Sequence, residues 1–145
     1  MIIMFERDLP GYDLARLLKL AIVHDLGEAI HGDTPATEQY LDPDRPERER
    51  RDMAVLCAPL PTDVREEMLE LWDDYARARS PEAVLVKGFD KLETMLQHLV
   101  GHNAPDFNYQ FNLTYGASHT RRHPLLRDLR AIVDSETKQR IHQQV

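Results

Sequence analysis

Apolar residues recur at helical spacing along most of the chain, and no alternating strand pattern runs for more than a few residues. The clearest helix begins at Ser80-Pro81-Glu82, where serine caps a helix, proline suits its first turn and an acid complements its dipole. Its apolar stripe predicts a helix that crosses the core and ends at Gly101. The stripe consists of Leu85, Phe89, Leu92, Leu96 and Leu99. The pattern as a whole predicts an all-α fold.

Four further helices are expected, with an irregular, aromatic-bearing connection at Asn103–Thr120. Thr62 is expected to cap one of them, and Met1–Phe5 reads as the end of a helix whose beginning is missing. The expected helices run from Tyr12 or Asp13 to Val23, from Pro46 to Ala58, from Thr62 to near Ala78, and from Pro124 to Ile141. The last of these is expected to bury Leu125, Leu126, Leu129, Ile132 and Val133.

The length of 145 residues predicts a single domain over residues 1–145, with no room for a second. Apolar residues make up 42% and charged residues 30% of the chain, so it is expected to fold rather than stay disordered. The longest mixed apolar run, Leu14–Val23, contains Arg16 and Lys19, and it is too short to cross a bilayer. No membrane partner is expected.

The charge balance argues against a nucleic-acid polymer as partner, because 25 acidic residues stand against 18 basic ones, a net charge of −7. Cys57 is the single cysteine, which excludes an internal disulfide framework and a four-cysteine zinc site. A lone cysteine fits a reducing compartment, so a cytoplasmic location is expected.

The chemistry concentrates at His24-Asp25, with Glu28 following at helical spacing. Imidazole and carboxylate together suit a divalent cation such as Mn, Co, Fe, Ni or Zn, and Mg less readily. By itself, however, such a doublet is more often a helix cap or a surface ion pair than a metal site.

A second acidic pair, Asp90 and Glu93, lies on the apolar helix, with Asp90 beside Phe89. A carboxylate that enters a core needs a partner, and a cation shared with the His-Asp doublet would supply one. A pair with Lys87 or with an arginine on another helix is the alternative.

These motifs, in this order, resemble the HD-domain metal-dependent phosphohydrolases, and within them the 5'-deoxynucleotidase-like branch. The resemblance runs from the first residues to about Leu99 and is loose beyond that. It is carried by Val23-His24-Asp25-Leu26-Gly27-Glu28-Ala29-Ile30-His31-Gly32-Asp33-Thr34-Pro35, by Glu70-Leu71-Trp72-Asp73-Asp74-Tyr75 and by Phe89-Asp90-Lys91-Leu92-Glu93.

The resemblance implies a helical bundle in which His24, Asp25 and Asp90 bind a divalent metal cation, with Glu28 and Asp33 as acidic residues of the reaction centre. It implies a phosphomonoesterase that releases phosphate from (deoxy)nucleoside 5'-monophosphates by attack of metal-activated water. A hydrolase of another phosphorylated nucleotide and a non-catalytic metal- or nucleotide-binding module are the alternatives.

The family's first metal-binding histidine has no counterpart here, because no histidine precedes His24. We therefore expect either an N-terminal truncation or a degenerate member. Three protein ligands still suffice to bind a metal with water in the open positions. Without an upstream helix, the apolar faces of Met1–Phe5 and Leu14–Val23 are expected to be partly uncovered and to associate in a homodimer.

Other conspicuous residues are expected to be structural. The basic run in Arg45–Arg51 is interleaved with acids, which is typical of a solvated helix. Trp72 is expected in the core and His98 at a surface-exposed helix end, and His31 is not assigned as a ligand. The aromatic residues between Phe107 and Tyr115 are expected to pack on the bundle rather than stack on a base.

Overall fold

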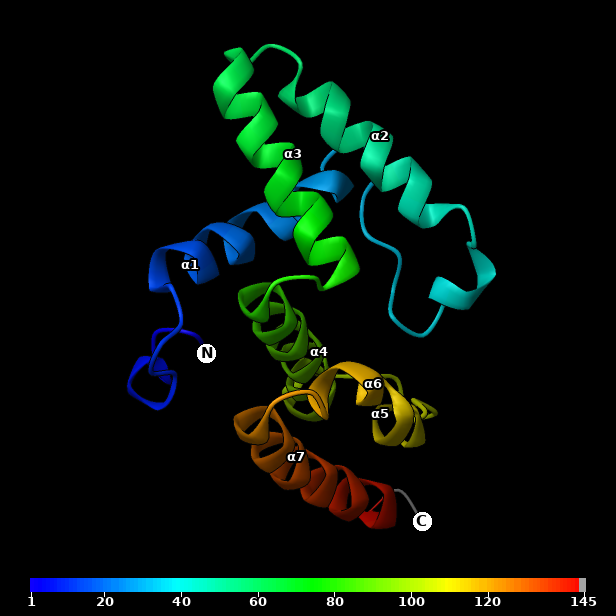
Figure 1. The fold of residues 1–145 in the computed structure, drawn as a ribbon. Coiled ribbons are helices and arrows are strands. Elements are labelled where there is room, and N and C mark those ends of the chain that lie inside the picture. The colour runs from blue at the N-terminus through cyan, green and yellow to red at the C-terminus, as the bar shows by residue number, and fades with distance from the viewer. Residues whose placement is uncertain (144–145) are drawn as a thin grey trace. The chain divides into compact units, whose positions relative to one another are not determined.

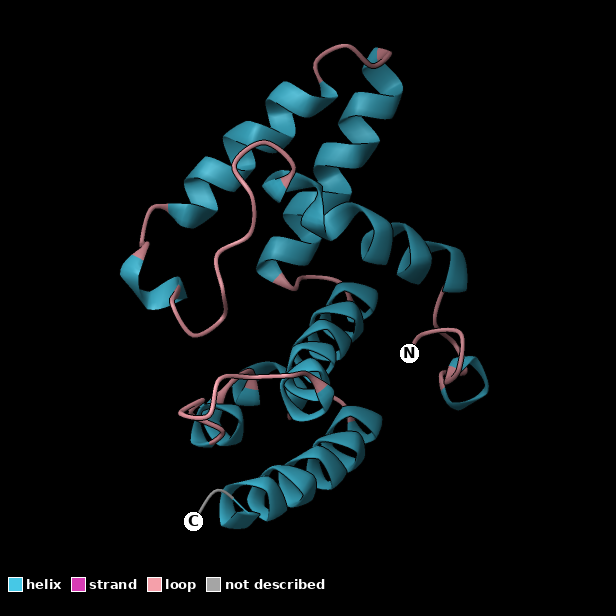
Figure 2. Cartoon of the chain, turned by 180° about the vertical axis from the view of Figure 1, so that it is seen from behind, coloured by secondary structure: helices cyan, strands magenta, loops and turns pink. Residues whose placement is uncertain are grey.

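The computed structural model describes residues 1–143 of the chain and divides it into two compact units. We call Gly11–Ala83 the central unit, and Met1–Pro10 together with Val84–Val145 the terminal unit. The described residues form helices and loops and contain no strand (Figure 2), which confirms the all-α prediction.

The central unit is built on three α-helices whose apolar faces meet. Helix α1 packs against α3, and α3 pairs with α2 (Figure 1). The core includes Leu17, Leu20, Met53, Trp72 and the wholly buried Cys57. The elements are α1 (Leu14–Val23), the 3-10 helices η2 (His24–Glu28) and η3 (Gln39–Leu41), α2 (Arg45–Cys57) and α3 (Thr62–Arg77).

Helix ends in the central unit follow local hydrogen bonding. The Asp13 carboxylate accepts from the Arg16 backbone N–H at 3.1 Å and so caps α1. The expectation that Thr62 caps α3 is wrong: Pro61 takes the cap position without a side-chain bond, and Thr62 is already helical. Helix α3 ends at Ala78, which adopts a left-handed conformation with φ 46°.

Asp74 joins the end of α3 to α1 and to the start of α4 (Pro81–Val100). Its buried carboxylate accepts from the Arg16 guanidinium at 2.6 Å and from the Ser80 backbone N–H and hydroxyl at 2.9 and 2.7 Å. Burial acts to raise its pKa, but the hydrogen bonds from Ser80 and Arg16 outweigh burial and keep the pKa below its usual value. The Ser80 hydroxyl also accepts from the Ala83 N–H at 3.0 Å, which confirms the predicted cap of α4.

The terminal unit contains most of α4 and the remaining helices, with α5 and α6 packed on α7. Its elements besides α4 are the 3-10 helix η1 (Glu6–Asp8), α5 (Gln110–Thr114), α6 (Ala117–Thr120) and α7 (Pro124–Gln143). The prediction of an irregular Asn103–Thr120 is therefore wrong in part. Residues Met1–Phe5 form turns rather than the end of a helix.

The predicted apolar stripes are buried only in part. On α4, Leu85, Phe89 and Leu92 are buried, whereas Leu96 is 38% exposed. On α7, Leu126 and Val133 are buried as expected. The prediction that Ile132 is also buried is wrong, because its side chain is 62% exposed.

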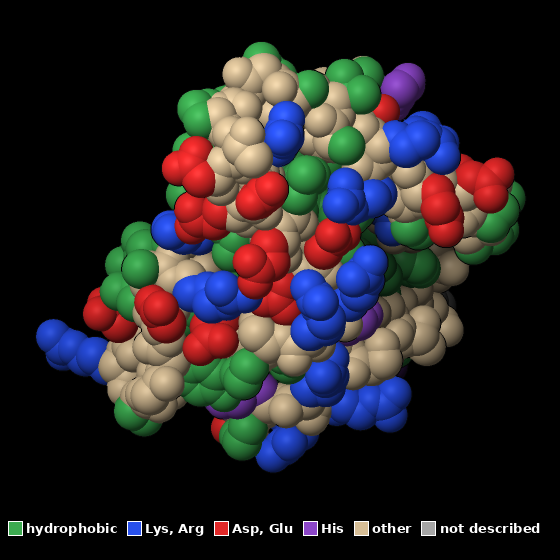
Figure 3. Space-filling view, turned by 45° about the horizontal axis from the view of Figure 1, so that its top comes forward, with side chains coloured by type: hydrophobic (Ala, Val, Ile, Leu, Met, Phe, Trp, Pro, Cys, Tyr) green, Lys and Arg blue, Asp and Glu red, His purple; other side chains and the backbone are tan. Residues whose placement is uncertain are grey.

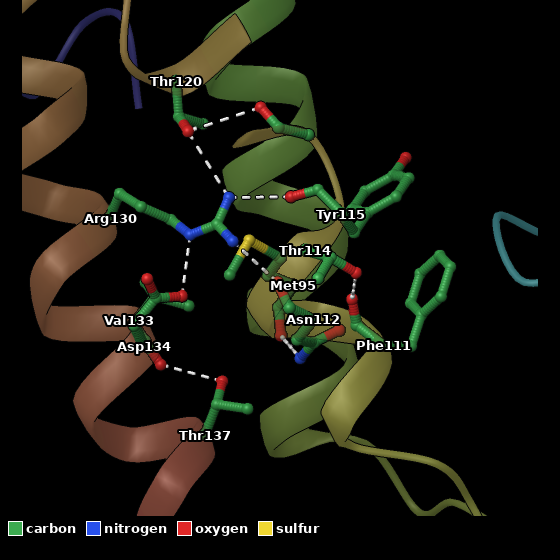
Figure 4. Close-up of polar contacts among 11 residues, drawn as sticks. Met95, Phe111, Asn112, Thr114, Tyr115, Thr120, Arg130, Val133, Asp134 and Thr137 are labelled. Carbon is green, nitrogen blue, oxygen red and sulfur yellow. Dashed lines mark hydrogen bonds and ion pairs between the residues drawn. The ribbon is translucent and has the colours of Figure 1, made fainter. Parts of the chain in front are cut away.

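Arg130 of α7 holds the short helices in place. Figure 4 shows its guanidinium surrounded by acceptors: Nε donates to Asp134 at 2.7 Å, Nη1 to the Tyr115 carbonyl at 2.7 Å and Nη2 to the Asn112 carbonyl at 2.8 Å. A longer bond of 3.4 Å reaches the Thr120 hydroxyl. Arg130 is buried, so it satisfies carbonyls at the end of α5 that water reaches poorly.

Acidic and basic side chains lie interleaved over the face seen in Figure 3. None of the described helices is long and apolar enough to cross a membrane. The expected uncovered apolar faces are found only in part. Ile3, Met4 and Ile22 are more than 70% exposed, but Leu17 and Leu20 are buried.

Candidate functional site

His24 and Asp25 lie where α1 passes into η2. The His24 Nε2 atom is 3.0 Å from Oδ1 of Asp25, and its Nδ1 atom is 2.8 Å from the Ala21 carbonyl oxygen. Because a carbonyl only accepts, Nδ1 carries a proton. The imidazole is mostly buried, whereas the Asp25 side chain is 68% exposed.

This arrangement fits a divalent cation. With Nδ1 as the donor, Nε2 of a neutral imidazole directs a lone pair toward a carboxylate oxygen, and two electron-rich atoms at that distance require a proton or a cation. A backbone carbonyl that fixes the tautomer is the usual partner of a metal-binding histidine. The role of His24 and Asp25 as metal ligands stays a prediction.

Glu28 stands in an acidic cluster at the end of η2. Burial, together with the carboxylates of Asp33, Asp25 and Glu49, raises the pKa of Glu28 to about 7, while Arg45 opposes them. In a 3-10 helix, residues three apart lie on one side, which brings Asp25 and Glu28 together. The structure thus gathers Asp25, Glu28 and Asp33, all of them predicted site residues.

Two members of this cluster on α2 were not anticipated. Arg45 Nη1 donates to Glu49 Oε1 at 3.0 Å and lies 4.0 Å from Glu28 Oε1. Glu49 is only 14% exposed at its side chain, and burial raises its pKa. The expectation of a fully solvated helix is wrong for this pair. The four-residue spacing of Arg45 and Glu49 was a sequence signal for an ion pair on one helix. Nothing in the sequence indicated that this pair would be buried against η2.

Gly27 explains how η2 is positioned. A Cβ atom at this residue would lie 2.8 Å from Nε1 of Trp72 and 3.0 Å from the Glu49 carbonyl oxygen. Only a glycine lets the indole of α3 and the backbone of α2 approach so closely. Trp72 is buried, as predicted, and its indole packs against η2 at Gly27.

His31 and Asp33 lie in the segment that follows η2 and precedes η3. The His31 Nδ1 atom is 2.6 Å from Oδ2 of the buried Asp52 on α2, so this histidine ties the loop to the helix. Asp33 is exposed, and its charge is felt at both Glu28 and Glu49.

Asp90 belongs to the terminal unit, where it forms an ion pair with its neighbour in the sequence. Its Oδ2 atom lies 2.8 Å from the ammonium nitrogen of Lys91, a pairing that neither of the predicted alternatives named. Glu93 points to solvent and accepts from Gln97 at 2.6 Å. Within residues 1–143, no three histidine, cysteine or acidic side chains are arranged as a ready metal site.

Comparison with known proteins shows relatives over most of the chain. The profile described as HD domain matches residues 1–130. The 5'-deoxynucleotidase HDDC2 of Dictyostelium discoideum is 30% identical over 133 residues, which cover 87% of this chain and 68% of that protein. The human 5'-deoxynucleotidase HDDC2 is 38% identical over 82 residues, or 57% of this chain and 40% of that protein. The 5'-deoxynucleotidase hdd1 of Schizosaccharomyces pombe is 35% identical over 92 residues, or 61% and 46%.

The profile covers both structural units and includes His24, Asp25, Glu28, Asp33 and Asp90. The chain belongs to the HD-domain family.

Proposed function

We propose that this protein is a divalent-metal-dependent phosphohydrolase that releases phosphate from deoxynucleoside 5'-monophosphates. The observation that carries the proposal is the His24 Nε2 atom facing the Asp25 carboxylate beside the acidic cluster of Glu28. The names of the relatives support the reaction and the deoxynucleotide class.

The proposed metal ligands are His24, Asp25 and Asp90, within one domain that includes both units. The HD-domain profile matches residues 1–130, and all three proposed ligands lie within this range. When bound, a divalent cation would supply a nucleophilic water and offset the charge of the phosphate. Mn, Co, Fe, Ni, Zn and Mg are all candidates for this cation.

Glu28 is the proposed acid-base residue. A carboxyl group whose pKa lies near 7 exchanges protons readily at neutral pH, so Glu28 is suited to take a proton from the attacking water. Asp33 raises that pKa through its charge, and the proposed role of Asp33 is to keep Glu28 basic. Arg45 lowers the same pKa and so tunes it toward neutrality.

We also propose a cytoplasmic homodimer. Ile3, Met4 and Ile22 are exposed apolar side chains of the kind that symmetric interfaces bury. Sedimentation velocity tests the dimer, and a monomer at micromolar concentration would refute it.

The deciding experiment combines metal analysis with a phosphatase assay. Protein purified without chelator is analysed for bound metals, then stripped, reloaded with each divalent cation and assayed with dAMP and AMP. We expect metal-dependent release of phosphate with a preference for dAMP. His24→Ala and Asp90→Ala are expected to lose both the metal and the activity.

The controls separate the alternatives. His102→Ala changes an exposed histidine outside the site and is expected to change neither reading. Metal binding without hydrolysis of any nucleotide would identify a binding module instead. Unchanged metal content in both alanine variants would refute the ligand assignment.

A further inference from the structure

Lys91 is held in an unusual place beside Asp90. Its ammonium nitrogen lies 2.8 Å from Asp90 Oδ2 and 5.4 Å from the centre of the Tyr115 ring. Both side chains of the ion pair are mostly buried, with 18% of Lys91 and 21% of Asp90 exposed. Neighbouring side chains on a helix diverge by about 100°, so contacts from elsewhere must turn the lysine back onto the preceding residue.

The turn between α5 and α6 provides those contacts. Gly116 has φ +64°, and a Cβ atom there would lie 2.6 Å from Cβ of Lys91. The backbone of the turn therefore lies directly on the lysine stem. The turn itself is held by Arg130, which donates to the carbonyls of Tyr115 and Asn112 (Figure 4).

Among the charges that act on His119 of the terminal unit, those of Lys87, Lys91 and Arg122 are positive and that of Asp90 is negative. Burial lowers the pKa of His119, and the charges of Lys87, Lys91 and Arg122 lower it further, while Asp90 alone among the named groups raises it. Lys91 and Lys87 thus lie close enough to act on one imidazole. When the Asp90 carboxylate binds a metal ion, the Lys91 ammonium would need another anion in its place.

We propose that Lys91 is the phosphate-binding cation of the active site and the counter-ion of Asp90 when no metal is bound. This inference rests on the proposed function, since it takes Asp90 as a metal ligand and a phosphate monoester as substrate. An ammonium group presents three donors and suits a phosphate dianion as well as a carboxylate. The contacts of Lys91 with Gly116 and Tyr115 hold the ammonium beside Asp90.

The proposal predicts opposite effects of one substitution. Lys91→Met removes the cation that competes for Asp90, so Mn²⁺ should bind about tenfold more tightly. It also removes a donor to phosphate, so inorganic phosphate should bind the Mn²⁺-saturated protein at least about tenfold more weakly. Damage to the fold would weaken both, and it would not tighten either.

The experiment measures both affinities by calorimetry on the full chain. Mn²⁺ is titrated into metal-stripped protein, and inorganic phosphate into the Mn²⁺-saturated form. Lys91→Arg keeps the charge and should retain phosphate binding within about threefold. Lys138→Met removes an exposed lysine of the same unit and should change neither affinity. Lys91→Gln replaces the methionine variant if that variant does not fold.

Tighter Mn²⁺ and weaker phosphate binding in the neutral variant would support the proposal. Unchanged phosphate binding, or weaker Mn²⁺ binding, would overturn it while leaving the proposed phosphohydrolase intact. A wild-type protein that takes up no divalent cation would overturn the metal assignment itself, and with it this inference.

Discussion

Glu28 and Asp90 are carboxylates in two units of the same chain, and their surroundings differ in sign. Burial and the carboxylates of Asp33, Asp25 and Glu49 outweigh Arg45 and raise the pKa of Glu28 to about 7. Asp90 instead bonds Lys91 and shares its neighbourhood with Lys87.

The difference shows what each region lacks. An acidic cluster with too little positive charge is stabilised by a cation, and a basic neighbourhood by an anion. The proposed metal-dependent hydrolysis would use both, a divalent cation to activate water and a cationic group for the phosphate. The predictions that follow test each side of this contrast.

The largest effect is expected from Arg130, which holds the turn that packs on Lys91. Arg130→Met leaves the carbonyls of Asn112 and Tyr115 without their donor and Asp134 without its cation. We expect a loss of about 3–5 kcal/mol in the free energy of unfolding, measured by urea denaturation followed by circular dichroism. The control is Arg127→Met, because Arg127 is an exposed arginine of the same helix. Equal effects in both variants would contradict the role of the network.

On the acidic side, the charge of Glu28 is the feature to remove. Glu28→Gln should lower turnover of dAMP by at least about a hundredfold, because the proposed proton acceptor is lost. Metal content should fall far less. Glu47→Gln changes an exposed acid of α2 and should leave turnover unchanged. Loss of metal in step with activity would make Glu28 a ligand.

The third prediction concerns Asp74, whose carboxylate should stabilise the fold in a way that depends on pH. Its folded pKa is lowered below the usual value, so the stabilisation is complete above about pH 4 and is lost as the pH falls through the folded pKa. Asp74→Asn should cost about 2 kcal/mol at pH 7, and the gap to the wild type should close below pH 4. Urea denaturation across this pH range measures it. A gap that does not depend on pH would show that charge is not responsible.

The smallest effect concerns Glu28 without metal. A glutamate whose folded pKa is raised costs nothing below pH 4 and destabilises increasingly as the pH rises toward 7. In chelator at pH 8, Glu28→Gln should therefore unfold with a free energy about 1 kcal/mol higher than the wild type, after allowance for solvent screening. Saturating Mn²⁺ should abolish this advantage. A variant less stable than the wild type in chelator would contradict the sign.

Sequence predicted the features that depend on neighbouring residues. Ser80 caps α4 through a bond to Ala83, three positions on, as its residue type and the Pro81 and Glu82 that follow indicate. The cap that Asp13 provides for α1 was not predicted. The sequence also predicted that the helix beginning at Tyr12 or Asp13 runs to Val23, and α1 ends there, next to His24 and Asp25. Features that depend on residues distant in the sequence were not predicted. The short helices α5 and α6 depend on hydrogen bonds from Arg130, and the burial of Glu49 depends on how α2 packs against η2. Periodicity has no access to such contacts.

The burial of Cys57 determines how the two units can be observed separately. The single cysteine and the single tryptophan of the chain, Cys57 and Trp72, both lie in the core of the central unit. Burial raises the pKa of the Cys57 thiol, so alkylating reagents should label it only when this unit opens. Thiol labelling and indole fluorescence then both measure unfolding of the central unit, and neither detects independent unfolding of the terminal unit. Comparing their rates with amide exchange in α7 would measure whether the two halves of the chain unfold as one cooperative unit.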